Sequence, residues 1–141
     1  MEILDALISR SRFTEIPDLL VSSETKSMVE QLERDVAGKG IGFDEYLGSL
    51  KKTRAELLLD LTPSAIKRIK GALLTRAIAG NQNVNVGDDE VTATIAREFT
   101  ANANDREARE RTKEREFRSY VRNILASRKV MEYLKKQVIR L

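Results

Sequence analysis

Apolar residues recur at three- and four-residue spacing in nearly every segment of this 141-residue chain. Such spacing places apolar side chains on one face of an α-helix. Glycine, proline and clusters of polar residues interrupt the pattern, and no segment has the alternation and tight turn of a β-hairpin. The sequence therefore predicts an all-α fold of roughly six helices joined by short connections.

The composition favours the same class. Hydrophobic residues make up 41% of the chain and charged residues 33%, whereas aromatic residues make up 5% and tryptophan is absent. The core must then come from Leu, Ile, Val and Ala, which suits helix packing better than a β-sandwich. The length suits one domain, residues 1–141.

The chain contains no histidine and no cysteine. Histidine is the commonest general base and metal ligand, and cysteine supplies disulfides and thiolate metal sites. A Ser-His-Asp or Cys-His hydrolase cannot be built from this chain alone. We therefore expect no enzymatic activity, no catalytic residue, no metal site and no cofactor.

The charge and the hydropathy of the chain limit the kinds of partner that we expect it to bind. The 25 basic and 22 acidic residues give a net charge of +3, a near balance that does not indicate a nucleic-acid partner. No apolar run is long enough to span a bilayer, and the first residues lack the pattern of a signal peptide. We expect a cytoplasmic protein without a membrane partner.

The helix boundaries follow from punctuating residues. A helix is predicted to have Pro17 in its first turn and to end at Gly38-Lys39-Gly40. Phe43 to Leu61 form one apolar stripe behind an acidic first turn, which predicts a single helix. Thr62 and Pro63 predict the next helix start, with threonine as the N-cap and proline in the first helical position.

The second half of the chain follows the same rules. Residues 81–86 are polar and are predicted to form an extended connector. Asp88, Asp89 and Glu90 then open a helix with Val91, Ile95 and Phe99 as its buried stripe. Three neighbouring carboxylates could bind a metal or act as an acid/base pair, but acidic residues also favour a helix N-terminus through the helix dipole.

Two further segments suggest binding sites. Residues 38–42 combine glycines with a lysine, yet neither Ser nor Thr follows the lysine and no strand precedes it, as a phosphate loop requires. Residues 106–118 are rich in arginine and could contact nucleic-acid phosphates. Interleaved glutamates would repel the same phosphates, so a solvated helix face is favoured.

Some segments carry more apolar surface than one packing face needs. Leu57, Leu58 and Leu59 are consecutive, and Leu19, Leu20 and Val21 form a similar run. In a thin, open array of helices part of this surface would stay exposed, and exposed apolar patches mark sites that bind other chains.

The order of several short motifs resembles the C-terminal domain of bacterial trigger factor. The motifs occupy Phe13–Val21, Gly42–Leu47, Leu61–Lys70, Ile78–Val86 and Arg128–Leu134. They include an aromatic residue before an Ile-Pro pair, a glycine before an acidic Tyr-Leu helix start, and a closing Lys-Val pattern with a Tyr-Leu pair. Together they extend over almost the whole chain in the family's order.

This resemblance implies an elongated helical body with two protruding arms that form a cradle. It implies an ATP-independent chaperone that binds unfolded or nascent polypeptides. The family's ribosome-docking and prolyl isomerase domains are not expected in this chain, so contact with the ribosome would come only through those domains. The residues expected to contact substrate are Phe43, Tyr46, Leu47, Leu50 and Phe99.

Two alternatives remain at this stage. A nucleic-acid-binding helical protein would bind with a strong dependence on salt. A structural helical module would use its apolar faces to join copies of itself, for example as a homodimer, and would not bind unfolded clients.

Overall fold

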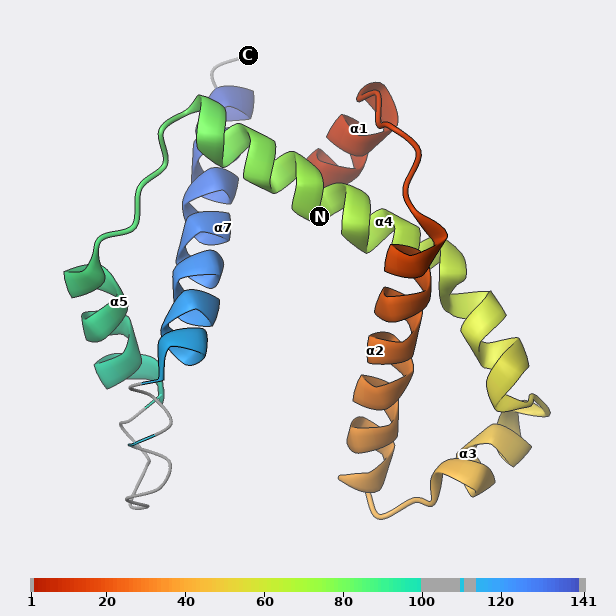
Figure 1. Ribbon diagram of the computed structural model, residues 1–141. Coiled ribbons are helices and arrows are strands. Elements are labelled where there is room, and N and C mark those ends of the chain that lie inside the picture. Colours follow the sequence, from red (N-terminus) through yellow and green to blue (C-terminus); the bar gives the residue numbers. More distant parts are fainter. Residues whose placement is uncertain (1, 100–109, 111–113, 140–141) are drawn as a thin grey trace. The chain divides into compact units, whose positions relative to one another are not determined.

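The computed structural model describes residues 2–99, 110 and 114–139, and every regular element in these ranges is helical (Figure 1). The prediction of an all-α fold is confirmed. The elements are α1 (Glu2–Arg10), α2 (Asp18–Ala37), α3 (Phe43–Leu50), α4 (Arg54–Asn81), α5 (Asp88–Thr94), the π-helical turn η1 (Ile95–Phe99) and α7 (Arg115–Ile139).

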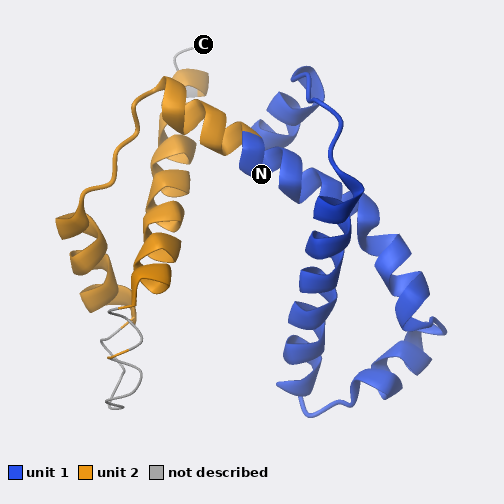
Figure 2. Cartoon of the chain, in the orientation of Figure 1, with its two compact units in different colours: residues 1–73 blue, residues 74–141 orange. Residues whose placement is uncertain are grey.

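The structure divides into two compact units, residues 1–73 and 74–141 (Figure 2). Unit 1 holds α1, α2, α3 and α4 up to Leu73. Unit 2 holds the end of α4, then α5, η1 and α7.

In unit 1, α1 packs on α4 at a glycine. A Cβ atom on Gly71 would lie 3.4 Å from Leu4 Cδ2 and 3.8 Å from Ile8 Cδ1. A small residue at position 71 therefore fits this contact, and a side chain much longer than a methyl group would collide with Leu4 and Ile8. An ion pair of 2.9 Å between Lys67 and Asp5 adds a polar contact at the edge of this interface.

A second packing centre of unit 1 joins α2, α3 and α4. Val29, Leu47 and Leu57 are buried together, one from each helix. Partly buried apolar side chains surround them: Leu32, Phe43, Leu58 and Leu61. These residues hold α2 against α3 and the first turns of α4.

The prediction of one helix from Phe43 to Leu61 was wrong. The α3 helix ends at Leu50, and Lys51 has φ 53°, the left-handed conformation that often terminates a helix. The next helix begins at Arg54 behind a capping box. The Thr53 amide donates to the Glu56 carboxylate at 2.7 Å, and the Glu56 amide donates to the Thr53 hydroxyl at 3.2 Å.

The predicted helix start at Thr62 and Pro63 was also wrong, because α4 continues through both residues (Figure 1). The Thr62 hydroxyl donates to the Leu58 carbonyl at 3.0 Å instead of capping a new helix. Pro63 has no N–H to donate to the Leu59 carbonyl, which costs stability inside a helix. Burial offsets this cost, since apolar residues at positions 57, 61, 65 and 69 keep one face across the proline.

Unit 2 is built around the contact of α5 and η1 with α7. Its buried core consists of Val86, Val91, Ile95, Val121 and Leu125. The connector predicted over residues 81–86 runs from the end of α4 to Gly87, the N-cap of α5, so this prediction is confirmed. Burial of Val86 ties the connector to the core.

Candidate functional site

Two leucines of unit 1 expose most of their surface to solvent. Leu19 on α2 is 83% exposed and Leu59 on α4 is 73% exposed. By contrast Leu57, two residues before Leu59, is 7% exposed and belongs to the core. The excess apolar surface noted in the sequence is therefore at least partly presented to solvent.

Leu59 lines a groove between α2 and the first half of α4, with a volume of about 260 Å³. We call it the α2–α4 groove. Its lining residues are Asp18, Val21, Ser22, Thr25, Lys26, Leu58, Leu59 and Thr62.

The threonines of the α2–α4 groove use their hydroxyl groups within their own helices. The Thr25 hydroxyl lies 3.1 Å from the Val21 carbonyl oxygen and 3.0 Å from that of Ser22. The Thr62 hydroxyl donates to Leu58. Because these polar groups are satisfied, the groove can accept an apolar side chain without leaving either hydroxyl unpaired.

The substrate-contact residues predicted on α3 have different environments. Phe43 and Tyr46 are half-buried, and their rings stack with centroids 6.1 Å apart. The Arg54 guanidinium lies 5.4 Å from the centre of the Phe43 ring. Leu50 is exposed, whereas Leu47 is buried in the core. Three of the four can thus present some apolar surface, and Leu47 mainly supports the helix.

The fifth predicted contact residue, Phe99, belongs to unit 2. It is 37% exposed, although the sequence also placed it on a buried stripe. Its ring meets Phe117 edge to face with centroids 5.3 Å apart, and Phe117 lies 6.3 Å from the Tyr120 ring. The five predicted residues therefore divide between the two units.

The sequence did not single out a second apolar surface, which follows one face of α7. A shallow groove of about 540 Å³ runs along this face, and all of its lining residues in the described part of the chain belong to α7. We call these residues the α7 stripe: Tyr120, Asn123, Ile124, Ser127, Arg128, Met131, Glu132 and Lys135. The available signal was a second set of apolar positions at helical spacing, offset from the stripe at Phe117, Val121 and Leu125.

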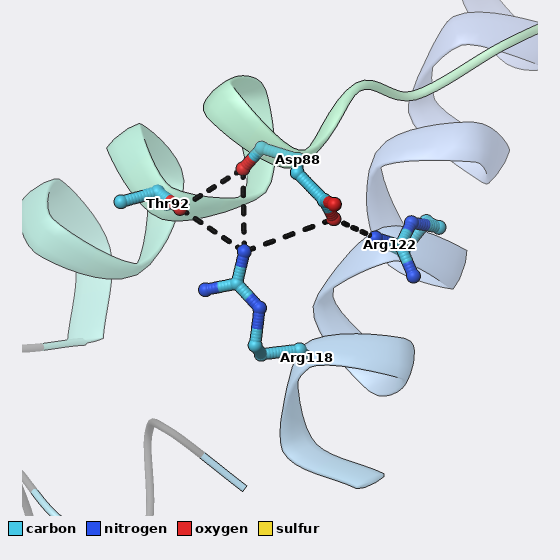
Figure 3. Close-up of polar contacts among 4 residues, drawn as sticks. All are labelled: Asp88, Thr92, Arg118 and Arg122. Atoms are coloured by element: carbon cyan, nitrogen blue, oxygen red, sulfur yellow. Dashed lines mark hydrogen bonds and ion pairs between the residues drawn. The ribbon is translucent and has the colours of Figure 1, made fainter. Parts of the chain in front are cut away.

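The acidic start of α5 is engaged by arginines of α7 (Figure 3). Arg122 forms an ion pair with the Asp88 carboxylate, which also lies 3.8 Å from Arg118. Arg118 donates to the Asp88 carbonyl at 3.3 Å and to the Thr92 hydroxyl at 3.0 Å. Asp88 therefore helps to fasten α5 to α7, and no group of residues in the described ranges could hold a metal ion.

Two more ion pairs join α7 to η1 and to α5. Arg128 donates to both carboxylate oxygens of Glu98, at 3.0 and 3.1 Å. These bonds, followed by one from Arg97, lower the pKa of Glu98, and Glu98 in turn raises the pKa of Arg128. Lys129 donates to Glu90 at 2.7 Å. The charged surface of unit 2 thus has a structural role.

The other two segments that the sequence suggested as binding sites show no ligand-binding arrangement among their described residues. Residues 38–42 form the turn between α2 and α3, in which Gly40 has φ 75°. Most of the arginine-rich segment 106–118 lies outside the described residues, and Arg118 binds Asp88 and Thr92 as above. None of the helices in the described ranges has the length and hydropathy needed to cross a membrane.

Comparison with known proteins gives a consistent result. The family described as "Bacterial trigger factor protein (TF) C-terminus" matches residues 1–136. The trigger factor of Ureaplasma urealyticum is 33% identical over 96 residues, which are 68% of this chain and 20% of that protein. The trigger factor of Agathobacter rectalis is 26% identical over 94 residues, 67% of this chain and 21% of that protein.

The trigger factor of Carboxydothermus hydrogenoformans is 30% identical over 77 residues, 55% of this chain and 18% of that protein. The chain thus spans about a fifth of the length of the curated relatives it matches. No solved structure matches it.

Proposed function

This chain belongs to the family of bacterial trigger factor C-termini, and from that membership we propose that it is a chaperone module that binds unfolded or nascent polypeptides without ATP. The observation that carries the proposal is the exposure of Leu59, at 73%, beside a groove whose threonine hydroxyls are already hydrogen-bonded. A highly charged chain keeps this apolar side chain in solvent, which favours a role in binding other chains.

We assign the first contact to the α2–α4 groove. An unfolded chain exposes apolar side chains, and one of them would contact Val21, Leu58 and Leu59. Complete burial of one large aliphatic side chain contributes about 1.5–3 kcal/mol. A groove of this size therefore binds weakly and with little selectivity, and several such contacts are needed to hold a client.

A second contact is assigned to the exposed apolar edge of α3, where Phe43, Tyr46 and Leu50 remain accessible in part. Phe99 is kept as a contact candidate in unit 2. Leu47 is assigned a supporting role, since it contacts the core residues Val29 and Leu57. Release needs no nucleotide because each contact is weak and because folding of the client removes its exposed apolar segments.

The matched residues, 1–136, hold the family's C-terminal module and not its prolyl isomerase domain. We propose that any contact with the ribosome belongs to the other domains of the family. We also propose a cytoplasmic location, where nascent chains are made.

The test is suppression of aggregation when a chemically denatured client is diluted into buffer without ATP. The unmodified protein should slow aggregation at roughly stoichiometric ratios, because weak sites hold clients by mass action. Leu59→Ser should reduce the protection. Leu73→Ser is the matched control, since Leu73 is also an exposed leucine of α4 but does not line the groove.

Equal loss of protection in the two variants would contradict the assignment to the groove. Absence of protection by the unmodified protein at every ratio would contradict the chaperone function itself.

A further inference from the structure

The α2–α4 groove carries one charge at each end of its α2 side. Asp18, Ser22 and Lys26 follow one another at four-residue spacing on one face of α2, and all three line the groove. Asp18 is the first and Lys26 the last of the lining residues from α2, and their Cα atoms are about 12 Å apart along the helix axis. Both side chains are exposed. The groove therefore has an acidic end and a basic end.

Neither of these two charges is used inside the protein. In the described part of the chain, the Asp18 and Lys26 side chains form no ion pair and no hydrogen bond. Other charged residues of the same two helices do form ion pairs. Glu24 of α2 pairs with Arg68 at 3.4 Å, and Asp60 of α4 pairs with Lys52. The two charges at the ends of the groove thus remain available to a bound chain.

We propose that the α2–α4 groove selects extended client segments in which an apolar residue is flanked by one basic and one acidic residue, each two positions away. The inference rests on the proposed function, because it concerns the client contact assigned to this groove. In an extended chain, residues i, i+2 and i+4 point to the same face and span about 13 Å. The three client side chains would lie beside Asp18, Leu59 and Lys26, in the order basic, apolar, acidic.

Segments with other charge patterns are less favourable. Two acidic flanking residues would place a carboxylate beside Asp18, and two basic ones would place a cation beside Lys26; like charges repel in both cases. Charges directly next to the apolar residue point to the opposite face of an extended chain and face away from the groove. Exchanging the basic and the acidic residue is tolerated, because the client can then lie along α2 in the opposite direction.

The selection is weak, because both charges are exposed. One exposed ion pair changes a binding constant by about two- to fivefold. Salt screens such pairs, since the Debye length falls to about 3 Å at 1 M ionic strength. The preference for charge should therefore disappear at high salt, whereas the apolar contact with Leu59 should persist.

The test compares four short peptides with blocked termini in nuclear magnetic resonance titrations of the α2 amides. The peptides differ only in the two flanking residues, and their central sequences are Lys-Ser-Leu-Ser-Glu, Lys-Ser-Leu-Ser-Lys, Glu-Ser-Leu-Ser-Glu and Gln-Ser-Leu-Ser-Gln. The peptide with one lysine and one glutamate should bind most tightly, by at least about twofold over the uncharged peptide. This advantage should vanish in 1 M salt.

Charge reversal in the protein should reverse the preference. Lys26→Glu makes both ends of the groove acidic, so the peptide with two lysines should then bind most tightly. Asp18→Lys makes both ends basic and should favour the peptide with two glutamates. Lys39→Glu is the matched control, since it changes the net charge as Lys26→Glu does but lies in the turn after α2, outside the groove. Circular dichroism should confirm that the helices remain in each variant.

Equal affinity of the four peptides, or an unchanged order in Lys26→Glu, would overturn the charge selection while leaving the chaperone function standing. A change of order in Lys39→Glu as large as in Lys26→Glu would also overturn it, because the effect would then come from net charge. Failure of all four peptides to bind would overturn it as well. The proposed function fails by a different result, the absence of protection of a denatured client at every ratio.

Discussion

Thr53 and Glu56 cap the start of α4 together: the Thr53 backbone amide donates to the Glu56 carboxylate, and the Glu56 backbone amide donates to the Thr53 hydroxyl. Replacing Thr53 with Ala removes one half of this pair. The free energy of unfolding should fall by about 1 kcal/mol. Urea denaturation followed by circular dichroism measures the change.

The control for Thr53→Ala is Ser49→Ala. The Ser49 hydroxyl donates to the Tyr46 carbonyl within α3 and caps no helix start. If Ser49→Ala lowered the free energy of unfolding as much as Thr53→Ala, the loss could not be attributed to the helix cap.

Acid should weaken the contacts of Glu56 and Glu98 in the folded protein. The pKa of Glu56 is lowered first by the hydrogen bond from the Thr53 backbone, and that of Glu98 first by the hydrogen bond from Arg128. A carboxyl whose pKa is lower in the folded state stabilises the fold above its unfolded pKa. This contribution is lost as the pH falls through the lowered pKa.

Stability should therefore decline as the pH falls from about 5 through the ordinary glutamate range near 4.3. Glu98→Gln should flatten part of this decline, because it removes the carboxylate that accepts two hydrogen bonds from Arg128. Nuclear magnetic resonance titration should give a pKa for Glu98 below that of glutamate in an unfolded peptide. A value at or above it would contradict the bidentate contact with Arg128.

Leu47 and Leu50 should respond differently to truncation, although both were predicted as contact residues. Leu47→Ala removes a buried side chain and should lower the free energy of unfolding by about 2–5 kcal/mol. Leu50→Ala changes an exposed side chain and should alter it by less than about 0.5 kcal/mol. Equal effects in thermal or urea denaturation would mean that the core of unit 1 is misplaced.

Gly71 should control the docking of α1. A methyl group at this position would meet Leu4 at an ordinary van der Waals distance, so Gly71→Ala should be tolerated and could raise stability by up to about 1 kcal/mol through helix propensity. Gly71→Leu should push α1 away. Hydrogen exchange of the α1 amides should then become faster.

Gly80→Leu is the matched control for Gly71→Leu, because no atom lies within 4 Å of a Cβ atom built on Gly80. Exchange in α1 should stay unchanged in that variant. Equal acceleration in both variants would mean that α1 responds to any change in α4.

Several boundaries of the fold were predictable because single residues determine them. The glycines of residues 38–40 follow the end of α2, with Gly40 at φ 75°, and the acidic residues at 88–90 lie in the first turn of α5. Thr62 and Pro63 led to the wrong prediction of a helix start. The preference of proline for the first turn of a helix is a local effect, whereas the apolar face that continues across Pro63 is stabilised by packing in unit 1. The capping box at Thr53 and Glu56 was present in the sequence but was hidden within an apparently continuous apolar stripe.

The exposed surface was harder to predict. Leu57 and Leu59 have the same hydropathy and differ only in direction around the helix, yet one is buried and the other is exposed. Which of them packs depends on where α2 and α3 lie, and the apolar spacing of α4 alone does not show this. For the same reason Leu47 was expected at the binding surface, and the α7 stripe was not recognised.

The central claim is that an unfolded polypeptide contacts Leu59 in the α2–α4 groove without ATP. The most direct measurement places a photo-activated benzoylphenylalanine at position 59, with position 73 as the control, and uses a permanently unfolded client such as reduced, carboxymethylated α-lactalbumin. The account predicts a cross-link from position 59 to the unfolded client, little or none from position 73, and none to the native client. Equal cross-linking from both positions, or from neither, would contradict it.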